Sequence, residues 1–122
     1  MKPSIKKIDP ASEYYFEEGC FITELSNSSD DPNVSIVQAR VEPGKTTKWH
    51  ALEGVTERYV IQQGCGEVEI GNLPVQRVTI GDVVLIPPMA RQRIKNTGDR
   101  DLIFLAICSP AFTESAYHQL EE

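Results

Sequence analysis

The stretch that decides the fold is residues 44–64, which read GKTTKWHALEGVTERYVIQQG. A turn glycine at each end encloses one imidazole, His50, and one carboxylate, Glu57. A second glycine–proline stretch, residues 81–96, reads GDVVLIPPMARQRIKN and carries the amide of Gln92. These three donors converge if the strands that bear them close into a small barrel. Because imidazole nitrogens and side-chain oxygens are common ligands of divalent metals, the pattern indicates a metal site, and the amide makes it an unusual one.

The composition is that of an ordinary soluble globular protein. The chain has 122 residues, 40% of them hydrophobic and 25% charged, so we expect one domain with a real core. No run of 18 apolar residues is present, and the basic N-terminus has no apolar stretch behind it; neither a membrane span nor a secretory signal is therefore expected. The net charge of −6, without a concentrated basic cluster, argues against nucleic acid as a partner. Three widely spaced cysteines without a Cys-x-x-Cys pair fit a reducing cytoplasm.

The pattern along the chain predicts strands and turns almost throughout. Glycine, proline and asparagine clusters separate short apolar and β-branched runs, which is typical of a sandwich or barrel. The predicted strands are residues 20–25, 34–41, 58–61, 67–70, 75–80, 83–86, 92–95 and 102–108.

Three segments of this pattern carry more specific predictions. Residues 64–66, Gly-Cys-Gly, predict a hairpin between the strands on either side. The continuous apolar run of residues 102–108 is typical of a strand covered on both faces. The tail predicts a short helix over residues 114–121 with Thr113 as its cap, whereas residues 14–18 fit no element clearly.

Strand alternation predicts which side chains share the barrel interior with the three donors. Side chains two residues apart point to the same face of a strand, so the apolar neighbours of the donors also turn inward. An apolar pocket with a few convergent polar groups is the usual form of a small-molecule site. The inward apolar set is Leu52, Tyr59, Ile61 and Ile94.

The two stretches resemble the two signature motifs of the cupin superfamily. The first motif is Gly, five residues, His-x-His, four residues, Glu, six residues, Gly. This chain supplies Gly44, His50, Glu57 and Gly64 at those spacings, but Leu52 stands where the second histidine belongs.

The second motif matches in its framework and departs at its ligand. It reads Gly, five residues, Pro-x-Gly, two residues, His, three residues, Asn. Here Gly81, Pro87 and Asn96 match, whereas Met89 replaces the second glycine and Gln92 replaces the histidine. The similarity covers residues 34–110, so the resemblance implies an all-β, double-stranded β-helix barrel preceded by an N-terminal strand segment, residues 1–33.

In this family the ligand positions commonly bind a divalent metal, and the resemblance carries that expectation to His50, Glu57 and Gln92. Leu52 cannot coordinate, so a facial triad of two histidines and one carboxylate is not available from these positions. Ni²⁺, Zn²⁺, Mn²⁺ and Fe²⁺ all remain candidates. The resemblance also implies a homodimer, in which residues 14–16 and 20–22 would cover a sheet edge in the same chain or in a partner subunit.

Three functions remain open at this point. The first is a metal-dependent enzyme that acts on a small oxygenated organic molecule, with the metal as Lewis acid, Glu57 as ligand or general base and Tyr59 as a proton donor. The second is a barrel that binds a small ligand, with or without metal, and catalyses nothing. The third is a degenerate barrel in which His50, Glu57 and Gln92 only hydrogen-bond one another.

Overall fold

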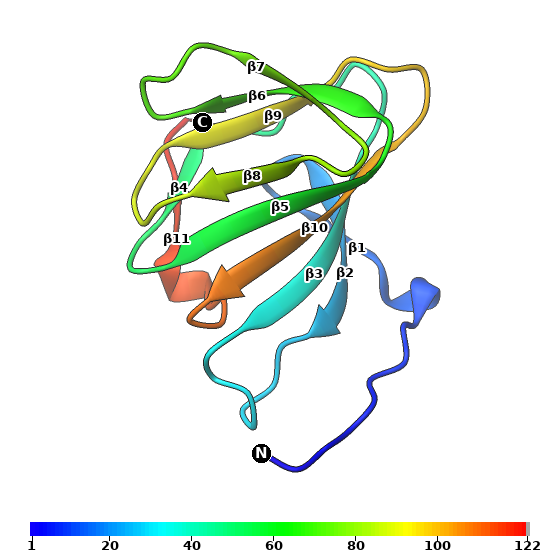
Figure 1. The fold of residues 1–122 in the computed structure, drawn as a ribbon, viewed down its shortest axis with the longest axis vertical. Helices are drawn as coiled ribbons and strands as arrows, with labels where there is room; N and C mark the ends of the chain where they lie inside the picture. The colour runs from blue at the N-terminus through cyan, green and yellow to red at the C-terminus, as the bar shows by residue number, and fades with distance from the viewer. Residues whose placement is uncertain (122) are drawn as a thin grey trace.

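Short strands form two facing sheets in the computed structural model, which describes residues 1–121 (Figure 1). The six-stranded sheet has the order β1-β2-β3-β10-β5-β8, and the five-stranded sheet has the order β11-β4-β9-β6-β7. The strands are β1 (Tyr14–Phe16), β2 (Cys20–Ser26), β3 (Ser35–Val41), β4 (His50–Leu52), β5 (Thr56–Gln63), β6 (Cys65–Ile70), β7 (Gln76–Thr79), β8 (Val83–Ile86), β9 (Gln92–Asn96), β10 (Leu102–Ser109) and β11 (Tyr117–Gln119). Single 3-10 turns, η1 (Pro10–Ser12) and η2 (Glu114–Ala116), precede β1 and β11.

The core lies between the sheets and follows the predicted alternation. On β5 and β10 every second side chain is buried, and the residues between them are half-buried or exposed. Leu52, Tyr59, Ile61 and Ile94 are all buried, which confirms the inward set. Leu52 packs with Val55 and Cys108 in a small cluster separate from the main core.

The predicted hairpin at residues 64–66 is wrong. β5 lies in the six-stranded sheet and β6 in the five-stranded sheet, so Gly64 is a corner at which the chain crosses between them. Gly64 has a φ of +83°, and a Cβ at this position would come within 3.0 Å of the Asp101 carbonyl oxygen. Glycine is therefore required both for the left-handed backbone and for the close approach of a neighbouring segment. The sequence Gly-Cys-Gly is compatible with a hairpin and with a corner between sheets. Which of the two forms depends on the sheet that each flanking strand joins, and contacts with distant segments decide this.

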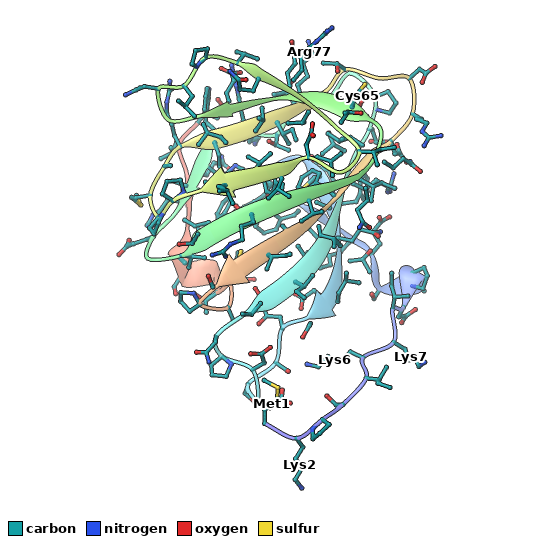
Figure 2. The ribbon with its side chains drawn as sticks, viewed as in Figure 1. Met1, Lys2, Lys6, Lys7, Cys65 and Arg77 are labelled. Atoms are coloured by element: carbon teal, nitrogen blue, oxygen red, sulfur yellow. The ribbon has the colours of Figure 1, made fainter. Side chains whose placement is uncertain are left out.

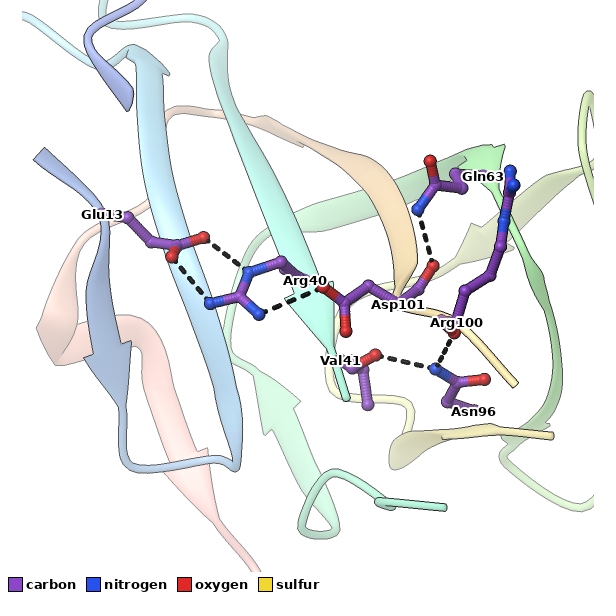
Figure 3. Close-up of polar contacts among 7 residues, drawn as sticks. All are labelled: Glu13, Arg40, Val41, Gln63, Asn96, Arg100 and Asp101. Atoms are coloured by element: carbon purple, nitrogen blue, oxygen red, sulfur yellow. Dashed lines mark hydrogen bonds and ion pairs between the residues drawn. The ribbon is translucent and has the colours of Figure 1, made fainter. Parts of the chain in front are cut away.

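Asn96, a framework residue of the second motif, connects two segments of the barrel through its side chain. The buried amide of Asn96 donates hydrogen bonds to the carbonyl oxygens of Val41 and Arg100, each at 2.8 Å, and so ties β3 to the turn before β10 (Figure 3). Met89, where the family motif has glycine, keeps a left-handed backbone with a φ of +66°. The glycine of the motif thus suits the backbone conformation that this chain retains with a side chain present.

The C-terminal helix expected over residues 114–121 does not form. A 3-10 turn at Glu114–Ala116 is followed by β11, and Thr113 makes no capping hydrogen bond. β11 pairs with β4, with Tyr117 opposite Leu52 and Gln119 opposite His50. A short isolated helix is marginal in water, so pairing with an open strand edge outweighs the local helix propensity of the tail.

The N-terminal segment extends the six-stranded sheet of its own chain. β1 pairs with β2, and β2 pairs with β3, so the segments 14–16 and 20–22 lie against their own barrel. The Arg40 guanidinium on β3 donates to Glu13, just before β1, and to Asp101, which also bonds Gln63 through its backbone (Figure 3). These contacts fix the start of the β1–β2 hairpin against the barrel wall.

The basic residues at the two ends of the molecule lie far apart. Figure 2 shows Lys2, Lys6 and Lys7 on the N-terminal segment, at the end opposite to Arg77 and Cys65. No helix among residues 1–121 is long and apolar enough to cross a membrane.

Candidate functional site

The two sheets bring the predicted donors together from opposite sides of the barrel. Glu57 and Tyr59 project inward from β5 of the six-stranded sheet. His50 on β4 and Gln92 on β9 are direct cross-strand partners in the five-stranded sheet. The exposed fractions are 8% for Glu57, 2% for His50 and 0% for Gln92, so the three polar side chains share a dry interior.

Both ring nitrogens of His50 have partners. Nδ1 lies 2.6 Å from the Lys48 carbonyl oxygen, and because a carbonyl only accepts, this nitrogen carries a proton. Nε2 lies 3.1 Å from Oε2 of Glu18. The ring also stacks on Tyr117, with 5.5 Å between centroids. Burial is the largest effect on His50 and lowers its pKa, which favours the neutral ring with a lone pair on Nε2.

Glu18 is a residue of the candidate site that the sequence did not predict. It lies in the turn between β1 and β2, and its carbonyl oxygen accepts a hydrogen bond from the Lys48 backbone N–H at 2.7 Å, which holds the turn beside His50. Burial raises the pKa of Glu18 to about 7. Below about pH 7 the carboxyl group of Glu18 keeps its proton and can donate it to Nε2 of neutral His50, whereas above this pH Glu18 carries a negative charge. In the sequence, Glu17-Glu18-Gly19 has the pattern of an exposed turn, and no local signal distinguishes Glu18 from its neighbour.

The Glu57 carboxylate is only partly satisfied. Its Oε2 lies 3.8 Å from the Cys108 sulfur, while its Oε1 has no hydrogen-bond partner among the residues that the structure describes. Burial raises the pKa of Glu57 to about 7, and the charge of Glu18 acts in the same direction. His50 and the Gln92 amide oppose this rise, so Glu57 lies within the field of both other predicted donors.

Tyr59 and Gln92 form the polar link between the sheets. The Tyr59 hydroxyl donates a short hydrogen bond of 2.5 Å to Oε1 of Gln92. Burial raises the pKa of Tyr59 well above its ordinary value, so the phenol keeps its proton. Within residues 1–121 the Gln92 Nε2 has no partner. An orphaned amide nitrogen and an orphaned carboxylate oxygen in one interior leave room for hydrogen bonds to a bound ligand.

A cavity of about 220 Å³ opens beside these residues. It extends along the inner face of the six-stranded sheet, and Glu18, Glu57 and Tyr59 line it together with Phe104 and Cys108. His50 and Gln92 are not among the lining residues, so they contact the cavity residues from behind. The structure thus divides the predicted site into a layer that lines the cavity, Glu57 and Tyr59, and a layer behind it, His50 and Gln92.

The donor set fits a divalent metal by its chemistry. It offers the Nε2 lone pair of His50, the carboxylate of Glu57 with its orphaned oxygen, and the amide oxygen of Gln92. His50 pairs with Glu18, however, so a metal at Nε2 has to replace that contact. Among residues 1–121 no group of three or more His, Cys, Asp or Glu side chains is arranged to hold a metal ion, but Gln92 lies outside those residue types.

Comparison with known proteins places most of the chain in a family. Residues 37–108 match the family model of the cupin domain. The chain is also 29% identical over 123 residues to an uncharacterized protein, MJ1618, of Methanocaldococcus jannaschii, and the match covers 99% of this chain and 95% of that protein.

Solved structures show the same fold at low identity. KdgF from a Halomonas species superimposes with a TM-score of 0.80 at 18% identity, covering 93% of this chain and 99% of that one. The Streptomyces nucleoside dehydratase Pac13 gives 0.78 at 18%, covering 97% and 92%. An uncharacterized Klebsiella pneumoniae protein with a double-stranded β-helix domain gives 0.74 at 16%, covering 89% and 90%.

The buried carboxylates predict a stability that falls as the pH rises. Because the pKa of Glu57 is raised from 4.5 to about 7 on folding, the folded state binds more protons than the unfolded state between these values. Its contribution is therefore complete below pH 4.5 and is lost as the pH rises through 7. In metal-free protein, we expect Glu57→Gln to reduce the loss of unfolding free energy between pH 5 and 8 by about 1–3 kcal/mol.

Urea unfolding at the two pH values, in the presence of a chelator, measures this change. Glu67→Gln, on the outer face of β6, is the matched control and should keep the wild-type pH dependence. An unchanged pH dependence in Glu57→Gln would show that this carboxylate is not desolvated.

Proposed function

The chain belongs to the cupin family, and we propose that it is an enzyme that moves a proton on a small oxygenated organic molecule held in the cavity beside Glu57. The observation that carries this proposal is that Oε1 of Glu57 has no hydrogen-bond partner among residues 1–121. Glu57 is only 8% exposed, and it lines the cavity. A buried acid or base that meets a ligand and lacks a structural partner is the arrangement expected of a general acid–base catalyst.

The neighbours of Glu57 suit this role. Burial and repulsion from Glu18 raise the pKa of Glu57 to about 7, so its protonated and ionised forms are close in free energy near neutral pH. The Glu57 carboxylate can therefore accept and return a proton. Tyr59 stays protonated, donates to Gln92 and lines the same cavity as Glu57, so its hydroxyl group is available to a ligand there. Glu18 and His50 hold a proton between them beside the same cavity. Glu57 is therefore the proposed catalytic residue, with Tyr59 beside it.

The solved neighbours support an enzyme without fixing its substrate. Pac13 is described as a nucleoside dehydratase, and removal of water from a hydroxylated molecule is a reaction of proton transfers. A barrel of this fold can thus hold such chemistry. The identity of 18% carries only the fold, so the dehydratase substrate is not transferred to this chain.

The proposal includes a divalent transition metal bound in the same interior. His50, Glu57 and Gln92 would hold it, and Ni²⁺, Zn²⁺, Mn²⁺ and Fe²⁺ are all compatible with one nitrogen and two oxygen donors. When bound, it would polarise a carbonyl or hydroxyl oxygen as a Lewis acid. The residues of the chain would then orient the ligand and exclude water around it.

Solvent-hydrogen exchange tests the proposed chemistry before any product is known. We expect the protein to catalyse incorporation of deuterium from D2O into members of a panel of small hydroxy-ketones and hydroxy-aldehydes, followed by proton NMR. Glu57→Gln should lower the exchange rate at least about 100-fold, because the amide cannot accept the proton. Tyr59→Phe should have a smaller effect, and Glu67→Gln none. Full exchange in Glu57→Gln would remove Glu57 from the mechanism; ligand binding without any exchange would leave a non-catalytic binding barrel.

Elemental analysis of untagged protein tests the metal. We expect one equivalent of a divalent metal that is lost in both His50→Ala and Gln92→Ala, since each removes one of only three donors. The control is His118→Ala, because the second histidine of the chain is on β11 and pairs with Glu53 instead. Metal retained without Gln92 would make this residue a lining group of the interior only, and metal absent from the wild type would favour a site that works through protons alone.

The outer face of the six-stranded sheet supports a homodimer. Ile103, Leu105 and Ile107 of β10 point away from the core, and cross-strand pairing continues this apolar row through Val60 to the edge strand β8. On β8 this row ends at Val83, which is 56% exposed, and Leu85, which lies opposite Arg58, is 68% exposed. A sheet face of this kind, next to an open strand edge, is suited to a second copy of the same face.

The outer face of the other sheet has the opposite character. There Glu69 pairs with Arg93, and the guanidinium groups of Arg91 and Arg93 each lie 4.3 Å from the centre of the Trp49 ring. Charges that are matched within the chain are typical of a solvated face. The apolar face is therefore the one that we propose to be covered by the partner.

Light scattering after size exclusion tests this arrangement. We expect a mass of about twice the 13.6 kDa of one chain, and a shift to a single chain in Leu85→Lys. Leu73→Lys is the matched control, since Leu73 is 66% exposed in the turn before β7 and should leave the mass unchanged. A wild-type protein that is monomeric at high concentration would contradict the dimer.

A further inference from the structure

We propose that the cavity takes a small organic cation, a molecule that carries a protonated amine next to an apolar or ring-sized body. This inference names the ligand class of the site described above, and so it rests on the proposed function for the role of that site. It is carried by the charge of the cavity, by the unpartnered oxygen of Glu57 and by the aromatic wall.

Every charged residue that lines the cavity is acidic. Glu18 and Glu57 lie deep, and Glu24 and Glu114 are exposed at the mouth. None of the lining residues that the structure describes is a lysine, arginine or histidine. The charges of Glu24 and Glu114 both raise the pKa of Tyr14, which also lines the cavity. Acidic side chains therefore lie both at the mouth and at the deep end of the cavity, and this charge attracts a cation.

The deep end of the cavity has an acceptor without a donor among residues 1–121. Glu57 is only 8% exposed, and its Oε1 has no partner within residues 1–121. A buried carboxylate oxygen without a donor costs more than a paired one by several kcal/mol in a dry interior. An ammonium group supplies both a positive charge and three donors, whereas a hydroxyl supplies one donor and no charge.

Four aromatic residues line the cavity in addition to Tyr59. Tyr14 and Phe16 come from β1, Phe104 from β10, and Phe112 from the segment before η2. The face of an aromatic ring attracts a cation through its quadrupole, most strongly when water is excluded. The volume of about 220 Å³ exceeds the 150 Å³ or so that accommodates benzene, so a single ring with an aminomethyl group is within its size.

The same features disfavour an anion. A carboxylate or phosphate ligand would bring a further negative charge beside Glu18 and Glu57 and would meet no basic side chain on the cavity wall. Arg40, on the adjacent strand β3, is outside the lining and is already bound to Glu13 and Asp101. Like charges at close range in a region of low dielectric constant repel by several kcal/mol.

Three probes of nearly equal shape separate charge from size: benzylammonium, benzyl alcohol and benzoate. Binding to the full-length protein is followed by two-dimensional amide NMR, as purified and after treatment with a chelator. We expect benzylammonium to bind at least ten times more tightly than benzyl alcohol, and benzoate not to bind to the chelated protein. Glu57→Gln should lower the affinity for benzylammonium about tenfold and leave that for benzyl alcohol unchanged, while Glu67→Gln changes neither.

A second variant keeps the test valid if Glu57→Gln does not fold. Glu114→Gln, at the exposed mouth, should weaken benzylammonium binding by a factor of about two to three and spare benzyl alcohol. Equal binding of benzyl alcohol and benzylammonium, or binding of benzoate in the chelated protein, would overturn the inference. Because no turnover is required, benzylammonium selectivity without any solvent-hydrogen exchange would defeat the proposed chemistry and leave the ligand class standing.

Discussion

Removal of the Glu57 carboxylate from water is the constraint around which the interior of this barrel is organised. A buried carboxylate needs a proton, a cation or a donor, and the chain provides none of these fully for Oε1. The nearby charge of Glu18 increases the demand, because two carboxylates in one dry space cannot both ionise at low cost. Below about pH 7 a proton held between Glu18 and His50 removes this repulsion. The remaining need is unmet among residues 1–121, and the residue that carries the unsatisfied oxygen lines the cavity.

The interior could be predicted from alternation along single strands, since side-chain parity is a local property. Once His50, Glu57 and Gln92 are placed inward, the neighbours Tyr59 and Ile94 follow, and the structure agrees. Gly44 and Gly81 likewise meet a local requirement, since both have a left-handed backbone. The sequence did not, however, show that Glu57 and Tyr59 line the cavity while His50 and Gln92 lie behind them. The position of a side chain relative to the cavity depends on how the two sheets pack against each other.

What could not be predicted depended on contacts between distant segments. Glu18 became a site residue only because the Lys48 backbone N–H holds the β1–β2 turn beside His50. The tail formed β11 instead of a helix because β4 offered an open edge. Gly64 became a corner between sheets instead of a hairpin for a similar reason. In each case the local propensity was compatible with two outcomes, and tertiary pairing decided between them.

The β1–β2 hairpin has a consequence for how the pocket can diversify. The stretch that matches the family, residues 37–108, contains Glu57 and Tyr59, whereas Tyr14, Phe16 and Glu18 come from outside it. Part of the cavity wall is thus encoded outside the stretch that carries the family resemblance. Replacement of the N-terminal hairpin in a related protein would change the shape and charge of the cavity and leave the Glu57 and Tyr59 positions unaltered, so similarity across the barrel alone is a poor guide to what such proteins bind.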